Sequence, residues 1–259
     1  MKIQQKQPIG AEVEAIQLKQ LTTAQALTIQ QLLADHGVLI FRNQHLSDGE
    51  FVNFLAQLGP LTFTTGEVPV ENHPDLNVVS NVGKIGTSKS RFHIDSSYFQ
   101  KPPAYSALRA VTIPPTGGET LFTNQYWAYE SLQDEIKQQL NDRTLRHVVS
   151  GLDLSNHKDA ETEANHPVFR VHPISGKTSL YLSTPLRCVA ASGLEEKVAI
   201  ELINACYNHS IQEQNIYRHQ WREGDIVIWD NGCTLHRADH SKVDGDRVLH
   251  RGLSLGYNA

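Results

Sequence analysis

The chain has 259 residues, enough to bury a large core, and 39% of them are hydrophobic, as in soluble globular proteins. A formal net charge of -5 argues against a nucleic-acid-binding surface, which needs basic side chains to neutralise phosphates. The first residues lack the apolar core of a signal peptide, and no apolar run reaches the roughly 18 residues of a membrane span. We therefore expect a cytoplasmic protein with no membrane or nucleic-acid partner, and a homo-oligomer is compatible with the sequence.

The three cysteines, Cys188, Cys206 and Cys233, are widely spaced and form no Cys-x-x-Cys motif. An odd number in a reducing compartment indicates neither a disulfide framework nor structural zinc. Cys233 lies close to His236 and could line a site there, but a buried core position is the expected one for a free cysteine.

In chain order, hydrophobic spacing and capping signals predict helices separated by short strands. The first helix covers residues 21–36, with Thr22 or Thr23 as its cap and Gly37 at its end. A capping box of Ser47 and Glu50 starts a second helix that runs to about residue 58. Two further helices are expected at 127–140, with Asn124 as a cap, and from a capping box of Ser192 and Glu195 to about residue 209. Strands are expected at 38–41, 76–80, 107–112, 119–122, 166–171, 179–182, 226–229 and 248–255.

Two polar segments are expected to be loops near a functional site. Residues 81–91 are rich in Gly and Ser and basic, and they precede His93, so they fit either a lid over a site or a solvated surface loop. Residues 150–166 are polar and irregular and form a second loop. Short strands between Gly and Pro turns, with helices at intervals, predict a mainly β protein with flanking α-helices and a double-sheet barrel or jelly-roll core. We see no internal repeat or linker, so residues 1–259 are expected to be one domain.

The most informative motif is the pair His93 and Asp95. In an extended segment, residues two apart point to the same face, so an imidazole nitrogen and a carboxylate oxygen would be aimed at one point. His236 is the best candidate for a third ligand, and Arg247 follows it. Two histidines and one carboxylate on one face of a metal form the facial triad of non-haem Fe(II) oxygenases. The chain has 13 histidines, so no single spacing carries much weight.

Other interpretations of the same residues stay open at this point. A zinc hydrolase could use the same three ligands with an activated water, although hydrolysis gives no reason for Arg247 or Thr120. A silent small-molecule-binding barrel would not need the ligand set. Arg247 by itself could also form a surface ion pair with Asp244 or Asp246.

Five segments in order resemble the TauD/TfdA family of Fe(II)- and 2-oxoglutarate-dependent dioxygenases, over nearly the whole chain. These segments are Phe92-His93-Ile94-Asp95-Ser96-Ser97-Tyr98, Pro115 to Phe122, Ala128 to Leu132, His172 to Lys177, and Gly224 to Asn231 continuing to His236. The resemblance implies a cupin-like double-stranded β-helix in which His93, Asp95 and His236 bind Fe(II). It further implies that Arg247 and Thr120 bind the far carboxylate of 2-oxoglutarate.

The family chemistry implies a small-molecule substrate, dioxygen as a second substrate, and release of succinate and CO2. Hydroxylation of an unactivated C–H bond is favoured by the intact Asp95, while desaturation, epoxidation or cyclisation in a biosynthetic pathway are alternatives. Arg251 matches the arginine that binds the sulfonate in taurine dioxygenases, which favours an anionic substrate, although an ion-pair role is equally compatible. Lys89, Ser96 and Tyr98 are further candidates for substrate binding. Lys89 and the segment Thr62 to Thr65 depart from the taurine enzymes, which makes taurine itself doubtful.

Overall fold

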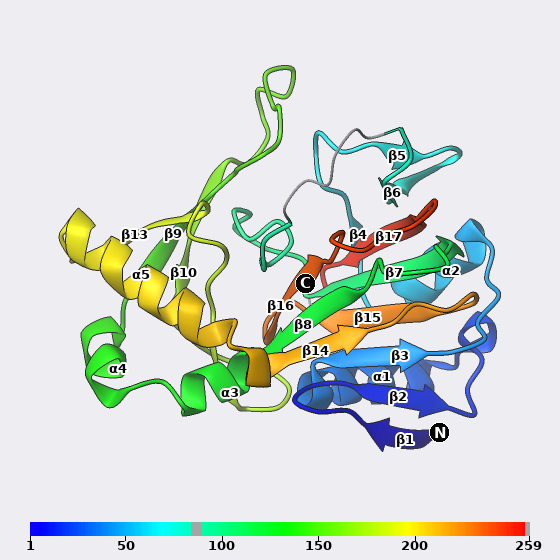
Figure 1. The fold of residues 1–259 in the computed structure, drawn as a ribbon, viewed down its shortest axis with the longest axis horizontal. Coiled ribbons are helices and arrows are strands. Elements are labelled where there is room, and N and C mark those ends of the chain that lie inside the picture. Colours follow the sequence, from blue (N-terminus) through cyan, green and yellow to red (C-terminus); the bar gives the residue numbers. More distant parts are fainter. Residues whose placement is uncertain (84–89, 257–259) are drawn as a thin grey trace.

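The computed structural model describes residues 1–83 and 90–256, and its centre is a pair of β-sheets that face each other (Figure 1). The larger sheet has nine strands. Its order is β1 (Lys2–Gln5), β2 (Ala11–Glu14), β3 (Val38–Phe41), β15 (Ile226–Asp230), β7 (Tyr105–Thr112), β17 (Val248–Ser254), β6 (His73–Ser80) and β5 (Pro69–Val70), with β4 (Leu61–Thr62) also on β17. The second sheet is β14 (Ile216–His219), β8 (Thr120–Asn124) and β16 (Thr234–Ala238).

The central strands of the large sheet are buried on both faces, which explains why they are continuous apolar runs. In β3, Leu39 and Phe41 belong to the core beneath the helices, whereas Val38 and Ile40 belong to the core between the two sheets. Alternate residues of β15 divide in the same way, and Trp229 faces the second sheet. A strand covered on both sides has no polar face to display, so it does not alternate.

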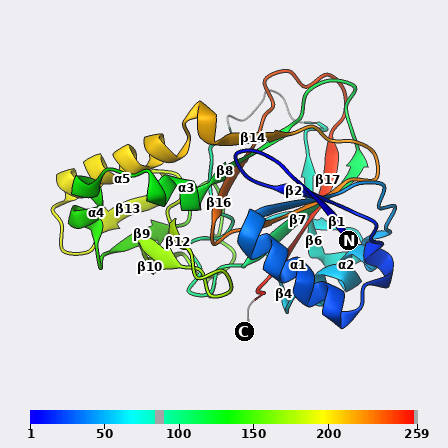
Figure 2. The same cartoon turned by 90° about the horizontal axis from the view of Figure 1, so that it is seen from below.

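Two helices cover the outer face of the large sheet (Figure 2). They are α1 (Thr23–His36) and α2 (Asp48–Ala56), and the 3-10 turn η1 (Leu18–Gln20) precedes them. Thr22 caps α1 and the Ser47 capping box starts α2, as predicted, and the Thr22 cap is itself a capping box with Gln25. Helix α2 ends two residues earlier than expected. Gly37 has a φ of +69° and follows α1, which confirms the predicted end.

A separate lobe lies beside the sheets, to the left in Figure 1. Its sheet has the order β10 (Glu163–Pro167), β9 (Thr144–Val148) and β13 (Cys188–Ala191), and α5 (Glu196–Ser210) packs on β13. A hairpin of β11 (Phe169–Val171) and β12 (Thr178–Leu180) confirms the expected one, and η2 (Glu213–Asn215) leads into β14. None of the described helices is long and apolar enough to cross a membrane.

Two helix predictions in this lobe need correction. The expected helix at 127–140 is two helices, α3 (Gln125–Glu130) and α4 (Asp134–Leu140), because Gln133 between them has a non-helical backbone with φ −58° and ψ 138°. Asn124 caps α3 as predicted. The expected capping box at α5 does not form, since the Ser192 hydroxyl accepts the Thr144 amide of β9 instead. A distant backbone partner has displaced the local one.

Candidate metal centre

Two histidines far apart in the sequence are joined through their backbones. The amide of His93 donates to the carbonyl of His236 in β16, and the His236 amide donates back, both at 3.0 Å. This reciprocal pair places the two side chains on one face, with ring centroids 4.3 Å apart. The structure therefore brings together the two imidazoles that the sequence singled out.

Asp95 completes the cluster. Its Oδ1 lies 3.7 Å from His93 Nε2, and its Oδ2 lies 3.5 Å from His236 Nε2. All three candidate ligand atoms lie within 4.8 Å of one another. The expected extended segment is only partly present, because the chain bridges to β16 at His93 and then turns from Asp95 onward. The turn, with Ser96 at a φ of +45°, brings the carboxylate in.

Hydrogen bonds fix the orientation of the Asp95 carboxylate. Ser106 Oγ of β7 donates to Oδ2 at 2.8 Å, and Asn231 Nδ2 in turn donates to Ser106 Oγ at 2.8 Å. Arg251 Nη1 donates to Oδ1 at 2.9 Å. Burial alone would raise the pKa of Asp95, but Arg251, His236 and His93 hold this pKa well below its usual range. The carboxylate is therefore ionised and held in place before any ligand arrives.

Both imidazoles are able to ligate as neutral rings. His93 Nδ1 lies 2.8 Å from the Arg91 carbonyl, which can only accept, so Nδ1 carries the proton and Nε2 keeps its lone pair. His236 is buried against Trp229, with ring centroids 4.4 Å apart, and burial lowers the pKa of His236 to about 3. Two neutral imidazoles and one carboxylate fit a divalent cation such as Fe(II).

A second polar site lies on the same inner face, around Arg247. This side chain is 1% exposed, and its Nε donates to the Gly118 carbonyl at 2.8 Å. It forms no ion pair within residues 1–83 and 90–256, so the alternative pairing with Asp244 or Asp246 is absent. Burial without an acidic partner lowers the pKa of Arg247 to about 10. Gly118 has a φ of +76°, and a Cβ there would lie 2.9 Å from Arg247 Cδ, so glycine is required.

Thr120 lies between Arg247 and Trp221. Its Oγ1 accepts from Arg247 Nη2 at 3.2 Å and from Trp221 Nε1 at 3.0 Å. Two incoming donors fill the acceptor positions of the hydroxyl and leave its own proton free to donate. Thr120 and Phe122 face the same side of β8, and Phe122 is paired with His236. This register places the arginine site and the histidine cluster on one face.

The residues expected to bind substrate have mixed outcomes. Arg251 lies on the inner face, but its guanidinium pairs with Asp95 and Glu67, which is the ion-pair alternative. Ser96 is buried and its hydroxyl lies 3.0 Å from that of Thr64. The Tyr98 hydroxyl is buried and forms no hydrogen bond within the described part of the chain. Lys89 lies outside the described residues, as does most of the predicted lid.

Sequence reasoning missed four residues of this site: Ser106, Glu67, Arg187 and Trp221. Each sits in a strand or loop without a motif and acquires its role through a partner remote in the sequence. Cys233, by contrast, is a fully buried free cysteine, as expected.

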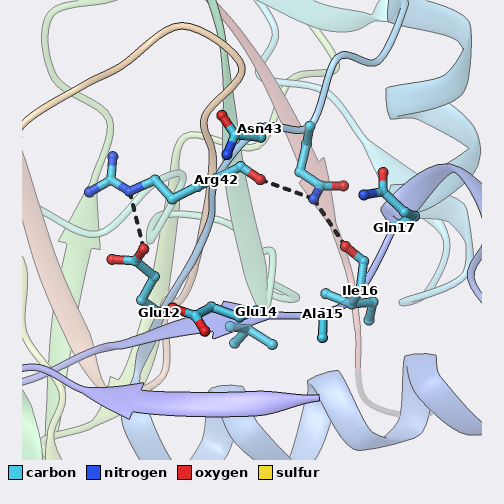
Figure 3. A pocket seen from close by; sticks show the side chains of 9 residues that line it. Glu12, Glu14, Ala15, Ile16, Gln17, Arg42 and Asn43 are labelled. Atoms are coloured by element: carbon cyan, nitrogen blue, oxygen red, sulfur yellow. Dashed lines mark hydrogen bonds and ion pairs between the residues drawn. The ribbon is translucent and has the colours of Figure 1, made fainter.

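A hollow of about 520 Å³ lies elsewhere, at β2 and β3 (Figure 3). Its polar groups already pair with one another, since Arg42 contacts Glu12 at 3.7 Å and Gln44 donates to the carbonyls of Ile16 and Arg42, each at 3.1 Å. It therefore offers no competing site for the chemistry.

Two facing sheets with a His, Asp and His cluster between them define the class of mononuclear iron oxygenases with a jelly-roll core. The family model "Taurine catabolism dioxygenase TauD, TfdA family" matches residues 2–253. The chain belongs to this family and is a dioxygenase, and the predicted jelly-roll fold is confirmed. Fe(II) and 2-oxoglutarate are the cofactor and co-substrate of this class, and small molecules and dioxygen are its substrates.

Known relatives cover almost the whole chain. A 2,4-dichlorophenoxyacetate dioxygenase of Cupriavidus pinatubonensis is 30% identical over 95% of this chain and 94% of its own length. An alkylsulfatase of Acinetobacter baylyi is 33% identical over 94% of this chain and 81% of its own. Among solved structures, a taurine dioxygenase from Burkholderia xenovorans has a TM-score of 0.84 at 29% identity, covering 99% of this chain and 91% of that one.

Proposed function

We propose that this enzyme uses Fe(II) and 2-oxoglutarate to hydroxylate an unactivated C–H bond of a small anionic molecule. In the balanced reaction, substrate, dioxygen and 2-oxoglutarate give hydroxylated substrate, succinate and CO2. The observation that carries the proposal is the Arg247 guanidinium, which has no acidic partner among the described residues and lies on the same inner face as the His93, Asp95 and His236 cluster. A metal cluster alone fits several chemistries, whereas a buried cation without an acid beside it requires an anion.

In this proposal His93, Asp95 and His236 hold Fe(II), which with the keto acid and dioxygen supplies the oxidising chemistry. The protein's own contribution is positional. Ser106 and Arg251 fix the Asp95 carboxylate, and the tautomer of His93 leaves Nε2 free to bind. These contacts exist in the protein before the metal arrives, so little reorganisation opposes binding.

Arg247 and Thr120 hold the far carboxylate of 2-oxoglutarate. A guanidinium fork matches a carboxylate bidentately, and its burial in the core excludes water from the pair. The free proton of the Thr120 hydroxyl provides a further hydrogen bond to the same group. Because the far carboxylate is held in one position, the keto and near carboxylate groups of 2-oxoglutarate are directed toward the metal cluster.

The choice of an anionic substrate rests on the surroundings and on the relatives. Arg251 and Arg187 both lie at the cluster, and Ser96 and Tyr98 lie beside them. The relatives are named for 2,4-dichlorophenoxyacetate, for sulfate esters and for sulfonates, and all of these carry an anionic group. Single-domain organisation over residues 1–259 is part of the same proposal.

The test is an anaerobic mixture of the protein, Fe(II) and 2-oxoglutarate. We expect a visible charge-transfer band that is lost in Asp95→Ala, followed by succinate release when oxygen and a suitable anion are admitted. Mass analysis of the product separates hydroxylation, which adds one oxygen atom, from desaturation, which removes two hydrogens. If the wild-type protein gives no charge-transfer band, whether or not it binds Fe(II), the proposal is wrong. A hydrolase would retain its turnover in Arg247→Ala.

A further inference from the structure

Arg251, whose guanidinium contacts the metal cluster at Asp95, already has carboxylate partners within the protein. Its Nη1 contacts Asp95 and its Nη2 contacts Glu67, while Thr64 and Asn77 lie at 3.5 Å from Nη2. Both terminal nitrogens therefore already have carboxylate partners. A substrate anion that approached Arg251 would have to displace Glu67 or meet its negative charge.

Glu67 is held in this position by the fold. The preceding Thr64 is buried and its hydroxyl contacts that of Ser96, and the Glu67 amide donates to the Thr64 carbonyl at 3.2 Å. On the following side, Val68 accepts the Val78 amide of β6 at 3.0 Å. Gly66 has a φ of +88°, and a Cβ there would lie 3.2 Å from Leu154 of the 150–162 loop. Glu67 is thus a built-in counterion of Arg251.

Arg187, like Arg247, has no carboxylate partner among the described residues. It follows β12 and precedes β13, and its Nη1 donates at 3.0 Å to the carbonyl of Ile94, which lies between His93 and Asp95. Its Nε donates to Ser150 Oγ at 3.2 Å. Its guanidinium lies 5.8 Å from the ring centroid of Tyr98. Within residues 1–83 and 90–256 no carboxylate pairs with it, and its Nη2 forms no hydrogen bond.

Among the described side chains that contact the cluster and its arginines, the charges leave room for one more negative charge. Arg187, Arg247 and Arg251 carry three positive charges against the two carboxylates of Asp95 and Glu67. A divalent metal ion and dianionic 2-oxoglutarate cancel each other. One positive charge remains, and the only one of the three arginines that neither the keto acid nor an internal carboxylate satisfies is Arg187. Burial lowers the pKa of Arg187, and the nearby Asp95 carboxylate only partly opposes this shift.

We infer that Arg187, rather than Arg251, receives the anionic group of the substrate, and that Glu67 sets this choice by neutralising Arg251. The inference rests on the proposed function and names the specificity residues of that same site. The substrate class is a small monoanion, either a carboxylate, a sulfonate or a sulfate ester. The Tyr98 hydroxyl is buried without a hydrogen bond in the described residues, and the Tyr98 ring centroid lies 5.8 Å from the Arg187 guanidinium.

The experiment measures binding of three monoanions and their neutral counterparts to the anaerobic complex of protein, Fe(II) and 2-oxoglutarate by equilibrium dialysis. The pairs are phenoxyacetate and phenoxyacetamide, pentanesulfonate and pentanesulfonamide, and hexyl sulfate and hexanol. We expect Arg187→Gln to weaken binding of the preferred anion by about 10- to 100-fold, as for loss of a hydrogen bond to a charged group, and to leave its neutral counterpart within about twofold.

Two further variants make the assignment specific. Arg187→Lys keeps the charge and should retain most of the anion affinity, within about fivefold of wild type. Glu67→Gln frees Arg251 and should strengthen anion binding by about tenfold, because a second cation becomes available. Arg170→Gln is the matched control, since Arg170 also stacks on a tyrosine, at 4.9 Å from the Tyr181 ring centroid, and should leave anion affinity unchanged.

The inference and the proposed function fail in different ways. Without a charge-transfer band in the wild-type protein, the proposed function is wrong. With the band present, the inference is overturned if no anion binds more tightly than its neutral counterpart, if Arg187→Gln weakens both members of a pair equally, or if Glu67→Gln weakens anion binding. Retention of the band in Arg187→Gln shows that the variant is folded and loaded.

Discussion

Arg247 immediately precedes β17 and Arg251 lies in the middle of it, and both are buried, but they have opposite surroundings. Among the residues that the structure describes, the Arg247 guanidinium forms hydrogen bonds only to the Gly118 carbonyl and the Thr120 hydroxyl, whereas Arg251 pairs with the carboxylates of Asp95 and Glu67. The positive charge of Arg247 therefore stays available for an incoming anionic ligand, whereas the charge of Arg251 is neutralised by carboxylates of the protein. Burial of an arginine therefore does not by itself mark a ligand site, because its partners decide the role.

The largest effect is expected from removing the unpaired cation. Arg247→Gln should raise the dissociation constant of 2-oxoglutarate by about 100-fold or more, because a buried, bidentate charge pair contributes about 3 kcal/mol. The quantity to measure is the 2-oxoglutarate concentration that gives half of the charge-transfer band. Arg109→Gln is the control, since Arg109 belongs to the same sheet but pairs with Asp48. An equal loss of 2-oxoglutarate affinity in the two variants would contradict a special role for the unpaired Arg247.

The contrast between Arg247 and Arg251 can also be tested by giving Arg247 an internal counterion. Thr120→Asp would place a carboxylate beside the guanidinium, as Glu67 does for Arg251, whereas Thr120→Asn changes the shape similarly without charge. Both variants lose the hydroxyl, but we expect 2-oxoglutarate to bind about 30-fold more weakly to the Asp variant than to the Asn variant. The same titration of the visible band measures both. Indistinguishable affinities would show that charge at this end is unimportant.

A smaller effect is expected at the metal cluster itself. Ser106→Ala removes the donor to Asp95 Oδ2 and leaves Arg251 on Oδ1, so the carboxylate is held at one oxygen only. Metal affinity should fall by about tenfold, in the range typical of lost hydrogen bonds to ligating groups. Competition with a chromogenic chelator measures this affinity. Ser241→Ala, which alters a surface turn beside Asp239, should not change it.

The smallest expected effect is a pH dependence of stability that comes from His147, a residue outside the candidate site. Burial lowers the pKa of His147, in the lobe, to about 3, so this histidine is neutral in the folded protein and takes up a proton on unfolding below about pH 6.5. Stability is therefore lost as the pH falls through 6.5. Between pH 7.5 and 6.0 His147 should account for about 0.8 kcal/mol of this loss. Urea unfolding of wild type and His147→Gln at both pH values measures it, and parallel losses would contradict the assignment.

Much of the sandwich could be predicted because its signals are local. The continuous apolar runs of β3 and β15, the cap at Thr22 and the capping box at Ser47 depend on neighbouring residues, and the structure confirms all of them. Short polar strands such as β1 were missed because their residues are exposed and show no apolar pattern. Ser192 failed as a cap for the opposite reason, since a β9 amide competed for its hydroxyl.

The candidate site divides in a similar way. The spacing of His93 and Asp95 predicted that their side chains would meet at one point, and the structure brings them together, although Asp95 lies in a turn. Arg247 and Arg251 were identified through the family resemblance. What could not be predicted is which cation has a counterion. That depends on Glu67, whose loop has no motif and reaches Arg251 only through the folded chain. The meeting of two side chains close in sequence can therefore be predicted, whereas charge pairing between remote segments cannot.

The reciprocal amide bonds between His93 and His236 have a consequence for how the enzyme is assembled. Two ligands from distant parts of the chain are fastened main chain to main chain, so their spacing is set by sheet registry and persists whether or not an ion is bound. Iron can then load, leave and be replaced without refolding of the polypeptide. Conversely, an ion that binds this preformed pair resists separation of the two segments and slows the opening of the sandwich at that seam.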